Sequence, residues 1–136
     1  YRFSYVDIGR QGASPDGGTW ASCSFRDALE QNTLNLPQSL NGIMYHFVVD
    51  DALPLTDRVV KPYPKSNPRL TSAERIFIYR LSRATRTIEN TFGILSSRWR
   101  VLRSPTIVQP TTAESVIKAT VVLHNYLMGN DRVILR

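Results

Sequence analysis

The sequence predicts a fold of the α/β or α+β class, because strand-like segments precede two long amphipathic helices. Residues 1–9 alternate in polarity and are rich in aromatic and β-branched side chains, and YHFVV at 45–49 is typical of a buried strand. After residue 71, apolar residues recur every three or four positions, as they do on one face of a helix. A length of 136 residues suits one globular domain.

The first half combines the two strands with turns and a short helix. The turn-rich, polar segment Arg10–Gly18 (RQGASPDGG) predicts a loop after the first strand. Ser24–Asn32 (SFRDALEQN) predicts a short helix with Ser24 as its N-cap. The second strand ends on the acidic pair Asp50-Asp51. Loops or short helical turns are expected after it, because prolines interrupt the chain at positions 54, 62, 64 and 68.

Two long helices follow, and each is predicted to begin with a capping box. The boxes are Thr71-Ser72-Ala73-Glu74 and Thr111-Thr112-Ala113-Glu114. Each helix carries an apolar stripe that we expect to form core. The stripes are Phe77, Leu81, Ala84, Ile88, Phe92, Leu95 and Trp99 in the first helix, and Val116, Ala119, Val122, Leu123 and Tyr126 in the second. Between the helices, WRVLRSPTIV predicts a short extended piece.

The net charge of +6 is unevenly distributed along the chain. From Arg58 to Arg103, eleven Lys or Arg residues stand against two acidic residues, which gives +9, while the remainder carries −3. Such a block favours a polyanionic partner, nucleic acid first. The alternative is a solvated helix face.

The few cysteine and histidine residues exclude several classes of site. A single cysteine, Cys23, leaves no internal disulfide, and with only His46 and His124 beside it a structural zinc site is not expected. We therefore expect a reducing, intracellular location. No apolar run approaches the roughly 20 residues that span a membrane. His124, beside the second apolar stripe, is expected to be a packed, hydrogen-bonded histidine and not a metal ligand.

Glu89 is the one acidic residue between Arg80 and Arg100. We expect its carboxylate to be half-buried at the edge of the apolar stripe and kept ionised by its basic neighbours. Two interpretations are open, a metal ligand or an i,i−3 ion-pair partner of Arg86, and spacing alone favours the ion pair. The arginines of this segment are Arg80, Arg83, Arg86, Arg98 and Arg100.

Asp50 strengthens the case for a metal site. An aspartate at the end of a buried strand stands where catalytic groups collect. Together with Glu89 it offers two hard oxygen ligands of the kind that Mg²⁺ prefers, and pairs of such ions cleave phosphodiesters. Further carboxylates are needed, and Asp7 and Asp16 are weaker candidates, since Asp16 in SPDGG favours a turn residue.

Six segments, in this order, resemble the DDE endonuclease domain of PIF/Harbinger-type transposases and their domesticated nuclease relatives. They are YVDIGRQGASPDGG, NTLNLP, FVVDDALPL, KPYP, ERIFIYRLSRATRTIENTFGILSSRWRVLRSP and VVLHNYL. The resemblance covers nearly the whole chain, and the long-helix block and the LHN triplet are its most specific parts. It implies an RNase H-like α/β fold, with a mixed sheet and long C-terminal helices. It also implies a catalytic Asp-Asp-Glu triad that binds two divalent metals, Mg²⁺ or Mn²⁺.

The resemblance assigns two members of that triad to this chain. VVDDALPL matches the family pattern around the second aspartate, which is Asp50, and RTIENTFGIL matches the pattern around the glutamate, which is Glu89. Val49 stands where the family has glycine, and Leu53 stands where it has an aromatic residue. Asp51 is the alternative aspartate if the register shifts by one.

The resemblance also implies that the chain is incomplete. Asp16 matches an acidic position of the family whose role is less defined. The first catalytic aspartate of the family lies on a strand that precedes residue 1. Residues 1–136 are therefore expected to form the C-terminal part of a single DDE endonuclease domain, without its first strand and inactive alone.

Three functional hypotheses follow. The first is a metal-dependent DNA endonuclease or transposase domain, which hydrolyses phosphodiesters or transfers strands and uses the five arginines above as phosphate contacts. The second is a domesticated, catalytically inactive DNA-binding or protein-interaction module. The third is an unrelated basic α/β domain in which Glu89 is a structural ion pair. The family resemblance further implies a nuclear (and cytoplasmic) protein that can oligomerise and has a separate Myb-like DNA-binding partner.

Overall fold

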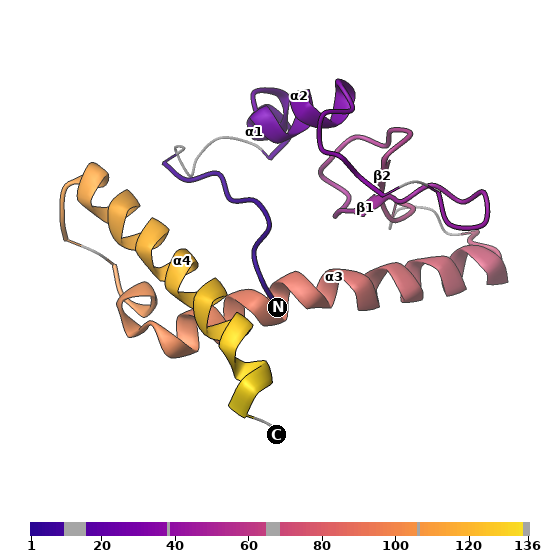
Figure 1. Ribbon diagram of the computed structural model, residues 1–136. Helices are drawn as coiled ribbons and strands as arrows, with labels where there is room; N and C mark the ends of the chain where they lie inside the picture. The colour runs from indigo at the N-terminus through magenta and orange to yellow at the C-terminus, as the bar shows by residue number, and fades with distance from the viewer. Residues whose placement is uncertain (10–15, 38, 65–68, 106, 135–136) are drawn as a thin grey trace. The chain divides into compact units, whose positions relative to one another are not determined.

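The computed structural model describes residues 1–9, 16–37, 39–64, 69–105 and 107–134 (Figure 1). It is a mixed α/β structure with a small parallel sheet and two long helices. Among the described residues, no helix is long and apolar enough to cross a membrane. The elements in order are α1 (Asp16–Ala21), α2 (Ser24–Glu30), β1 (Phe47–Val48), β2 (Val59–Val60), α3 (Ser72–Arg98), the 3-10 helix η1 (Arg100–Arg103) and α4 (Pro110–Ile134).

The chain divides into two compact units, which are described separately. The sheet unit comprises residues 12–86, with α1, α2, both strands and the first part of α3. The helix unit comprises residues 1–11 and 87–136, with the last part of α3, η1 and α4. That residues 1–136 form part of one family domain stays a prediction.

The sheet of the sheet unit has two short parallel strands. Phe47 pairs with Val59 and Val48 with Val60, and the Val49 N–H donates to the Val60 carbonyl at 3.0 Å. The predicted strand at 45–49 is thus confirmed at 47–48, but its predicted burial is wrong, because Val48 is exposed. Two strands cover little surface, and of the four residues in them only Val59 is fully buried. The second strand was missed among the prolines.

The short helices depart from the sequence prediction at their starts. Of the predicted loop, residues 10–15 lie outside the described residues and Asp16–Gly18 form the first turn of α1. The two glycines of this turn have low helix propensity. The contact of Trp20 with Phe25, whose ring centroids are 6.3 Å apart, stabilises α1. In α2 the N-cap is Cys23, not Ser24, and its side chain makes no capping hydrogen bond.

The capping box of α3 forms as predicted. The Thr71 backbone N–H and hydroxyl both donate to Glu74 Oε2, at 2.7 and 2.8 Å, and the Glu74 N–H donates to Thr71 Oγ1 at 3.3 Å. The backbone hydrogen bond from Thr71, and then its hydroxyl, lower the pKa of Glu74 below its ordinary value. The start of α3 is therefore specified locally.

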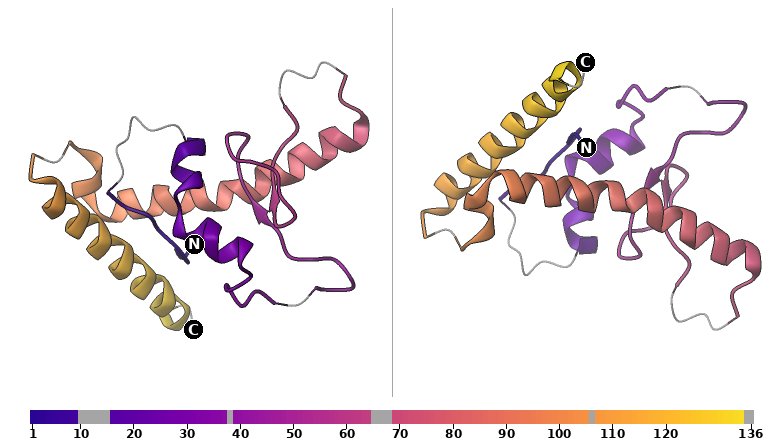
Figure 2. Two further views of the ribbon diagram at one scale, coloured as in Figure 1. Left: turned by 90° about the horizontal axis from the view of Figure 1, so that it is seen from above. Right: turned by 90° about the horizontal axis from the view of Figure 1, so that it is seen from below.

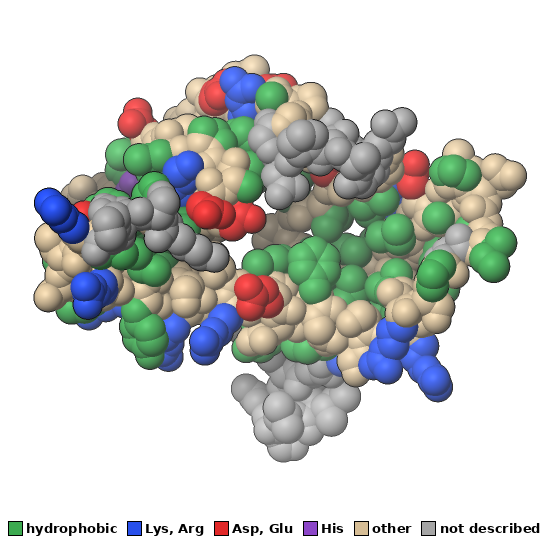
Figure 3. Space-filling view, turned by 180° about the vertical axis from the view of Figure 1, so that it is seen from behind, with side chains coloured by type: hydrophobic (Ala, Val, Ile, Leu, Met, Phe, Trp, Pro, Cys, Tyr) green, Lys and Arg blue, Asp and Glu red, His purple; other side chains and the backbone are tan. Residues whose placement is uncertain are grey.

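The apolar stripe of α3 is core at only two positions. Leu81 and Leu95 are buried, whereas Ile88 and Phe92 are 46% and 55% exposed. A helix of 27 residues is about 40 Å long, and the described partners do not cover that length. Figure 3 shows hydrophobic side chains (green) at the surface of one face of the molecule. The prediction of one continuous core stripe is wrong.

Phe3 fills the core of the helix unit. It clusters with Leu95 of α3 and Val121 of α4, and Trp99 and Leu102 pack against this cluster. Figures 1 and 2 show the start of the chain beside α3 and α4. Since Phe3 joins both helices, burial of its ring anchors residues 1–9.

The predicted strand at residues 1–9 does not form, although these residues are all described. Instead of a neighbouring strand, two side chains of α4 bind the backbone of this segment. The Phe3 N–H donates to Asn125 Oδ1 at 2.8 Å, and Asn125 Nδ2 donates to the Phe3 carbonyl at 2.7 Å. His124 Nε2 donates to the Tyr1 carbonyl at 2.7 Å. The Asn125 amide supplies the two hydrogen bonds that a residue of a neighbouring antiparallel strand would exchange.

The helix α4 differs from prediction at its start and in its buried face. It begins at Pro110, and the Gln109 carbonyl accepts from the Thr112 and Ala113 N–H groups, so the predicted capping box is not formed. The buried residues are Thr120, Val121 and His124. Of the predicted stripe, Ala119, Val122, Leu123 and Tyr126 are exposed and only Val116 is partly buried.

The segment before α4 also corrects a prediction. Residues 100–103 form η1, where an extended piece was expected. The Leu102 N–H donates to the Trp99 carbonyl at 3.0 Å, and Arg103 Nε donates to the Ser96 carbonyl at 2.9 Å. Trp99, with φ −108° and ψ 87°, interrupts the helical backbone, and these local bonds hold η1 next to the end of α3.

Candidate active-site carboxylates and basic helix

Asp50 follows β1 after one residue, in the sheet unit. Its Oδ1 accepts from the Ala52 N–H at 3.2 Å, which is an Asx-type turn. The side chain is exposed, and among the described residues no ion pair neutralises it. The turn therefore fixes one carboxylate oxygen and leaves the other available to a ligand.

The other acidic candidates near the first half of the chain are placed as follows. Asp51 is exposed in the same turn, and Lys61 Nζ donates to its backbone carbonyl at 3.2 Å. Asp7 is exposed in the N-terminal segment. Asp16 is the first residue of α1, so its assignment to a turn is wrong.

Glu89 lies on α3 within the helix unit and is exposed, not half-buried as expected. Among the described residues neither Glu89 nor Arg86 forms an ion pair, so the i,i−3 pair is not present. The cause is exposure, because a pair of flexible side chains in water gains little from one fixed geometry. The carboxylate is free to take another partner.

Glu89 lines an open groove of about 460 Å³ in the helix unit. Gly93 lies one helical turn further on, and a Cβ built on it would meet nothing within 4 Å. The absent side chain leaves the groove open beside the carboxylate. The lining residues are Tyr1, Glu89, Asn90, Gly93, Ile94 and Ser97.

The arginines of the long helix are all exposed. Arg80, Arg83 and Arg86 belong to the sheet unit, and their spacing of three places them along one side of α3. Arg98 and Arg100 belong to the helix unit, at the end of α3 and the start of η1. Exposed guanidinium groups at helical spacing can contact successive phosphates of a nucleic acid.

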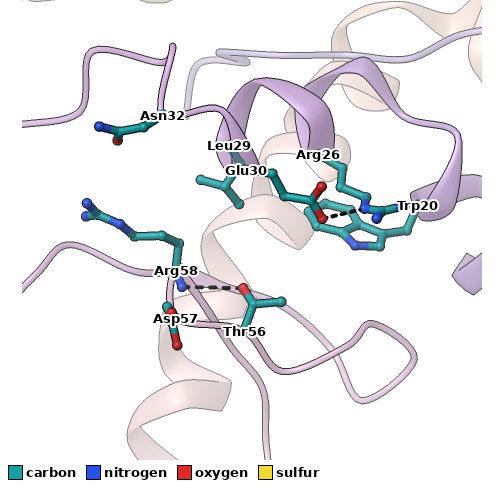
Figure 4. Close-up of a pocket in the computed structure, with 8 residues that line it drawn as sticks. All are labelled: Trp20, Arg26, Leu29, Glu30, Asn32, Thr56, Asp57 and Arg58. Atoms are coloured by element: carbon teal, nitrogen blue, oxygen red, sulfur yellow. Dashed lines mark hydrogen bonds and ion pairs between the residues drawn. The ribbon is translucent and has the colours of Figure 1, made fainter.

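Sequence reasoning missed two adjoining grooves in the sheet unit. Their volumes are about 390 and 550 Å³, and both are lined by Trp20, Arg26, Glu30 and Thr56. Figure 4 shows the first, with Trp20, Arg26 and Glu30 on one side of it and the segment of Thr56, Asp57 and Arg58 on the other. The only signal in the sequence was a tryptophan beside a polar, turn-rich segment.

Exposed carboxylates that can hold divalent ions, and exposed arginines at helical spacing, are both features of proteins that act on nucleic acids. The sequence profile of one family, described as DDE superfamily endonuclease, matches residues 1–125. The chain belongs to this family. No similar protein was found among curated proteins or solved structures. Membership indicates a nuclease or transposase type of function, and a domain of this kind would act on DNA.

The family also indicates the fold and the cofactor class. It suggests an RNase H-like fold, of which the described residues form a two-stranded sheet and the long helices. DDE endonuclease domains generally use divalent metals. The carboxylates of Asp50 and Glu89 have the donor chemistry that such ions require. Within the described part of the chain, however, no group of three or more His, Cys, Asp or Glu residues could hold a metal ion.

Proposed function

We propose that this chain is part of a Harbinger-type DDE endonuclease and carries the second aspartate and the glutamate of its catalytic triad. The single observation behind this is the family match over residues 1–125, which includes both VVDDALPL and RTIENTFGIL. The reaction is phosphodiester hydrolysis or strand transfer on DNA. The exposure of both carboxylates, with no ion pair to either among the described residues, supports the proposal.

Asp50 and Glu89 would hold the divalent ion, Mg²⁺ or Mn²⁺. When bound, such ions stabilise charge on the reacting phosphate and lower the pKa of bound water. The turn at Ala52 orients the Asp50 carboxylate. Arg80, Arg83 and Arg86, with Arg98 and Arg100, would attract the DNA and hold its backbone, a contribution that falls as salt rises.

A second function is a domesticated, inactive DNA-binding or protein-interaction module. Val49 and Leu53 favour it, because they replace the glycine and the aromatic residue that flank the aspartate in the family pattern. A valine before Asp50 restricts the backbone where glycine would not. In this case the basic helix would still bind DNA, but the carboxylates would be dispensable.

Cleavage of supercoiled DNA by the intact protein in Mg²⁺ or Mn²⁺ separates the two functions. We expect cleavage to be lost in Asp50→Asn and in Glu89→Gln, and to be kept in Asp51→Asn, which is the matched control from the same turn. Loss in Asp51→Asn with activity kept in Asp50→Asn would move the site by one residue, and an inactive wild type would favour the domesticated module.

The proposal extends to location and partners. A protein that acts on chromosomal DNA belongs in the nucleus, and a separate Myb-like protein would supply sequence-specific DNA binding. Oligomerisation would bring two catalytic domains to two DNA ends. Imaging of the tagged intact protein checks the first of these, and light scattering checks the last.

A further inference from the structure

The two grooves of the sheet unit are lined by residues outside the proposed triad. Their volumes, about 390 and 550 Å³, lie in the range of small-molecule sites. Trp20 lines both grooves (Figure 4). The second groove is also lined by Ala52, Leu53 and Pro54, which directly follow the Asp50-Asp51 pair. The site therefore begins beside the turn that carries Asp50.

Trp20 provides a braced aromatic surface in this site. Its ring meets Phe25 at 65° with centroids 6.3 Å apart, so Phe25 supports the indole without stacking on it. Phe25 in turn packs on Phe47 of β1, with centroids 5.0 Å apart at 85°. The chain of three rings holds the indole in place while it remains partly exposed. A fixed, accessible indole can stack on a planar ligand.

Hydrogen bonds also connect the polar groups around Trp20. Arg26 Nε donates to Glu30 Oε1 at 2.7 Å, and Arg26 Nη1 donates to the Ala21 carbonyl at 2.9 Å. Opposite them, the Arg58 N–H donates to Thr56 Oγ1 at 3.4 Å (Figure 4). Lys61 lines the second groove and is held at the acidic turn by its bond to the Asp51 carbonyl.

The described side chains that line the two grooves carry one more positive than negative charge. Arg26, Arg58 and Lys61 stand against Glu30 and Asp57, and of these Arg26 pairs with Glu30 at 2.7 Å. A planar ring with polar edges and one phosphodiester charge fits this arrangement. An apolar ligand would offer these polar and charged side chains no partner.

We propose that this site receives one unpaired nucleobase of the DNA, stacked on Trp20, with the adjoining phosphate at Lys61. The inference rests on the proposed function, because it takes DNA as the substrate. Stacking on an aromatic ring tolerates any base, so the site selects unpaired over paired DNA and not a particular sequence. Placing a base in the site needs less free energy when the base is already outside the duplex, because no base pair has to be broken.

The test compares two DNA duplexes, one fully paired and one with a single extrahelical base, bound to the intact protein in EDTA so that no cleavage occurs. Fluorescence anisotropy of labelled DNA gives both dissociation constants. We expect tighter binding of the duplex with the extrahelical base. Trp20→Leu should weaken that complex roughly 5- to 150-fold and leave the paired duplex nearly unchanged. Trp20→Phe should retain most of the effect.

Two controls separate stacking from folding. Tyr126→Leu removes an exposed aromatic residue of α4, outside the grooves, and should change neither constant. The chain has two tryptophans, so Trp99→Phe makes Trp20 the only indole. The fluorescence of Trp20 should then be quenched by the duplex with the extrahelical base at lower concentrations than by dTMP, a free nucleotide that carries one of the same bases.

Each other outcome contradicts the proposal. Equal affinity for both duplexes, or equal weakening of both by Trp20→Leu, would overturn the inference while DNA binding and the proposed function stand. Quenching by dTMP at lower concentrations than by the duplex would assign the site to free nucleotides instead. Failure of the wild type to bind either duplex would overturn the inference together with the proposed function.

Discussion

Asn125 and His124 hold the start of the chain by hydrogen bonds to the backbone of Phe3 and Tyr1. Both side chains come from the LHN triplet, and His124 is fully buried. Its role as a packed, hydrogen-bonded histidine is confirmed. Tyr1 also lines the groove at Glu89. The triplet therefore shapes one wall of the candidate site without contacting Glu89 itself.

Asn125→Ala should destabilise the protein by about 1–3 kcal/mol, because the N–H and C=O of the half-buried Phe3 segment both lose their partner. The free energy of unfolding from urea titration measures this. Asn125→Asp keeps an acceptor but loses the donor, so its effect should lie between those of wild type and Asn125→Ala. An unchanged stability in Asn125→Ala would mean that the N-terminal segment is not held by α4.

At the scale of single elements, α3 shows how a local signal can specify a boundary. The Thr71–Glu74 box depends on a charged acceptor, and the hydrogen bonds from Thr71 lower the pKa of Glu74. A lowered carboxyl pKa in the folded state contributes stability above the ordinary value of about 4.3. That contribution is lost as the pH falls through the folded-state pKa.

Glu74→Gln should therefore lower the melting temperature at pH 7, and the deficit should be smaller at pH 3, because the lowered pKa of Glu74 makes its charge contribute less as the pH falls. Thermal unfolding followed by circular dichroism at both pH values measures the difference between variant and wild type. Glu30→Gln is a comparison with a carboxylate outside the capping box. An equal deficit at both pH values would show that the charge of Glu74 does not matter.

Other elements were less predictable, for identifiable reasons. The buried face of α4 was predicted wrongly because apolar side chains occur on several sides of this helix. His124 and Asn125 face the core because they bind the N-terminal backbone. The strand β2 has only Val59 and Val60 to mark it. The segment 1–9 has strand-like sequence, but a strand needs a partner that local sequence does not supply.

The candidate site was predictable to the extent that it depends on linear motifs. Asp50 and Glu89 follow from their flanking patterns, and family membership is confirmed by the match over residues 1–125. Their environment was not predictable. The exposure of Glu89 depends on how much of α3 is covered, and the grooves at Trp20 need segments far apart in sequence to meet.

At the scale of the whole molecule, the basic block from Arg58 to Arg103 is the dominant feature of the charge distribution. Its net charge is +9, on a chain of +6 overall. If the partner is DNA, the binding constant should fall with rising salt as counterion release requires, and this dependence distinguishes DNA from an acidic protein. Each phosphate contact releases a condensed cation, which makes the dependence measurable contact by contact.

Replacing Arg80, Arg83 and Arg86 together by alanine should reduce the slope of log K against log salt by about 0.9 per contact, roughly 2.7 in total. Titrations of duplex DNA at several salt concentrations measure the slope. Lys118→Ala is the control, because Lys118 lies on α4 and pairs with Glu114 at 3.5 Å. A slope that is unchanged in the triple variant would make the arginines a solvated helix face.

Calorimetric titration of the intact protein with Mn²⁺ shows whether Glu89 and Asp50 are metal ligands. We expect wild type to bind Mn²⁺ and Glu89→Gln and Asp50→Asn each to lose binding, while Glu74→Gln binds as wild type does. A folded Glu89→Gln variant should retain its circular dichroism spectrum, because the side chain is exposed and has no ion pair among the described residues. Equal binding by wild type and Glu89→Gln would contradict the account and favour a domesticated DNA-binding scaffold.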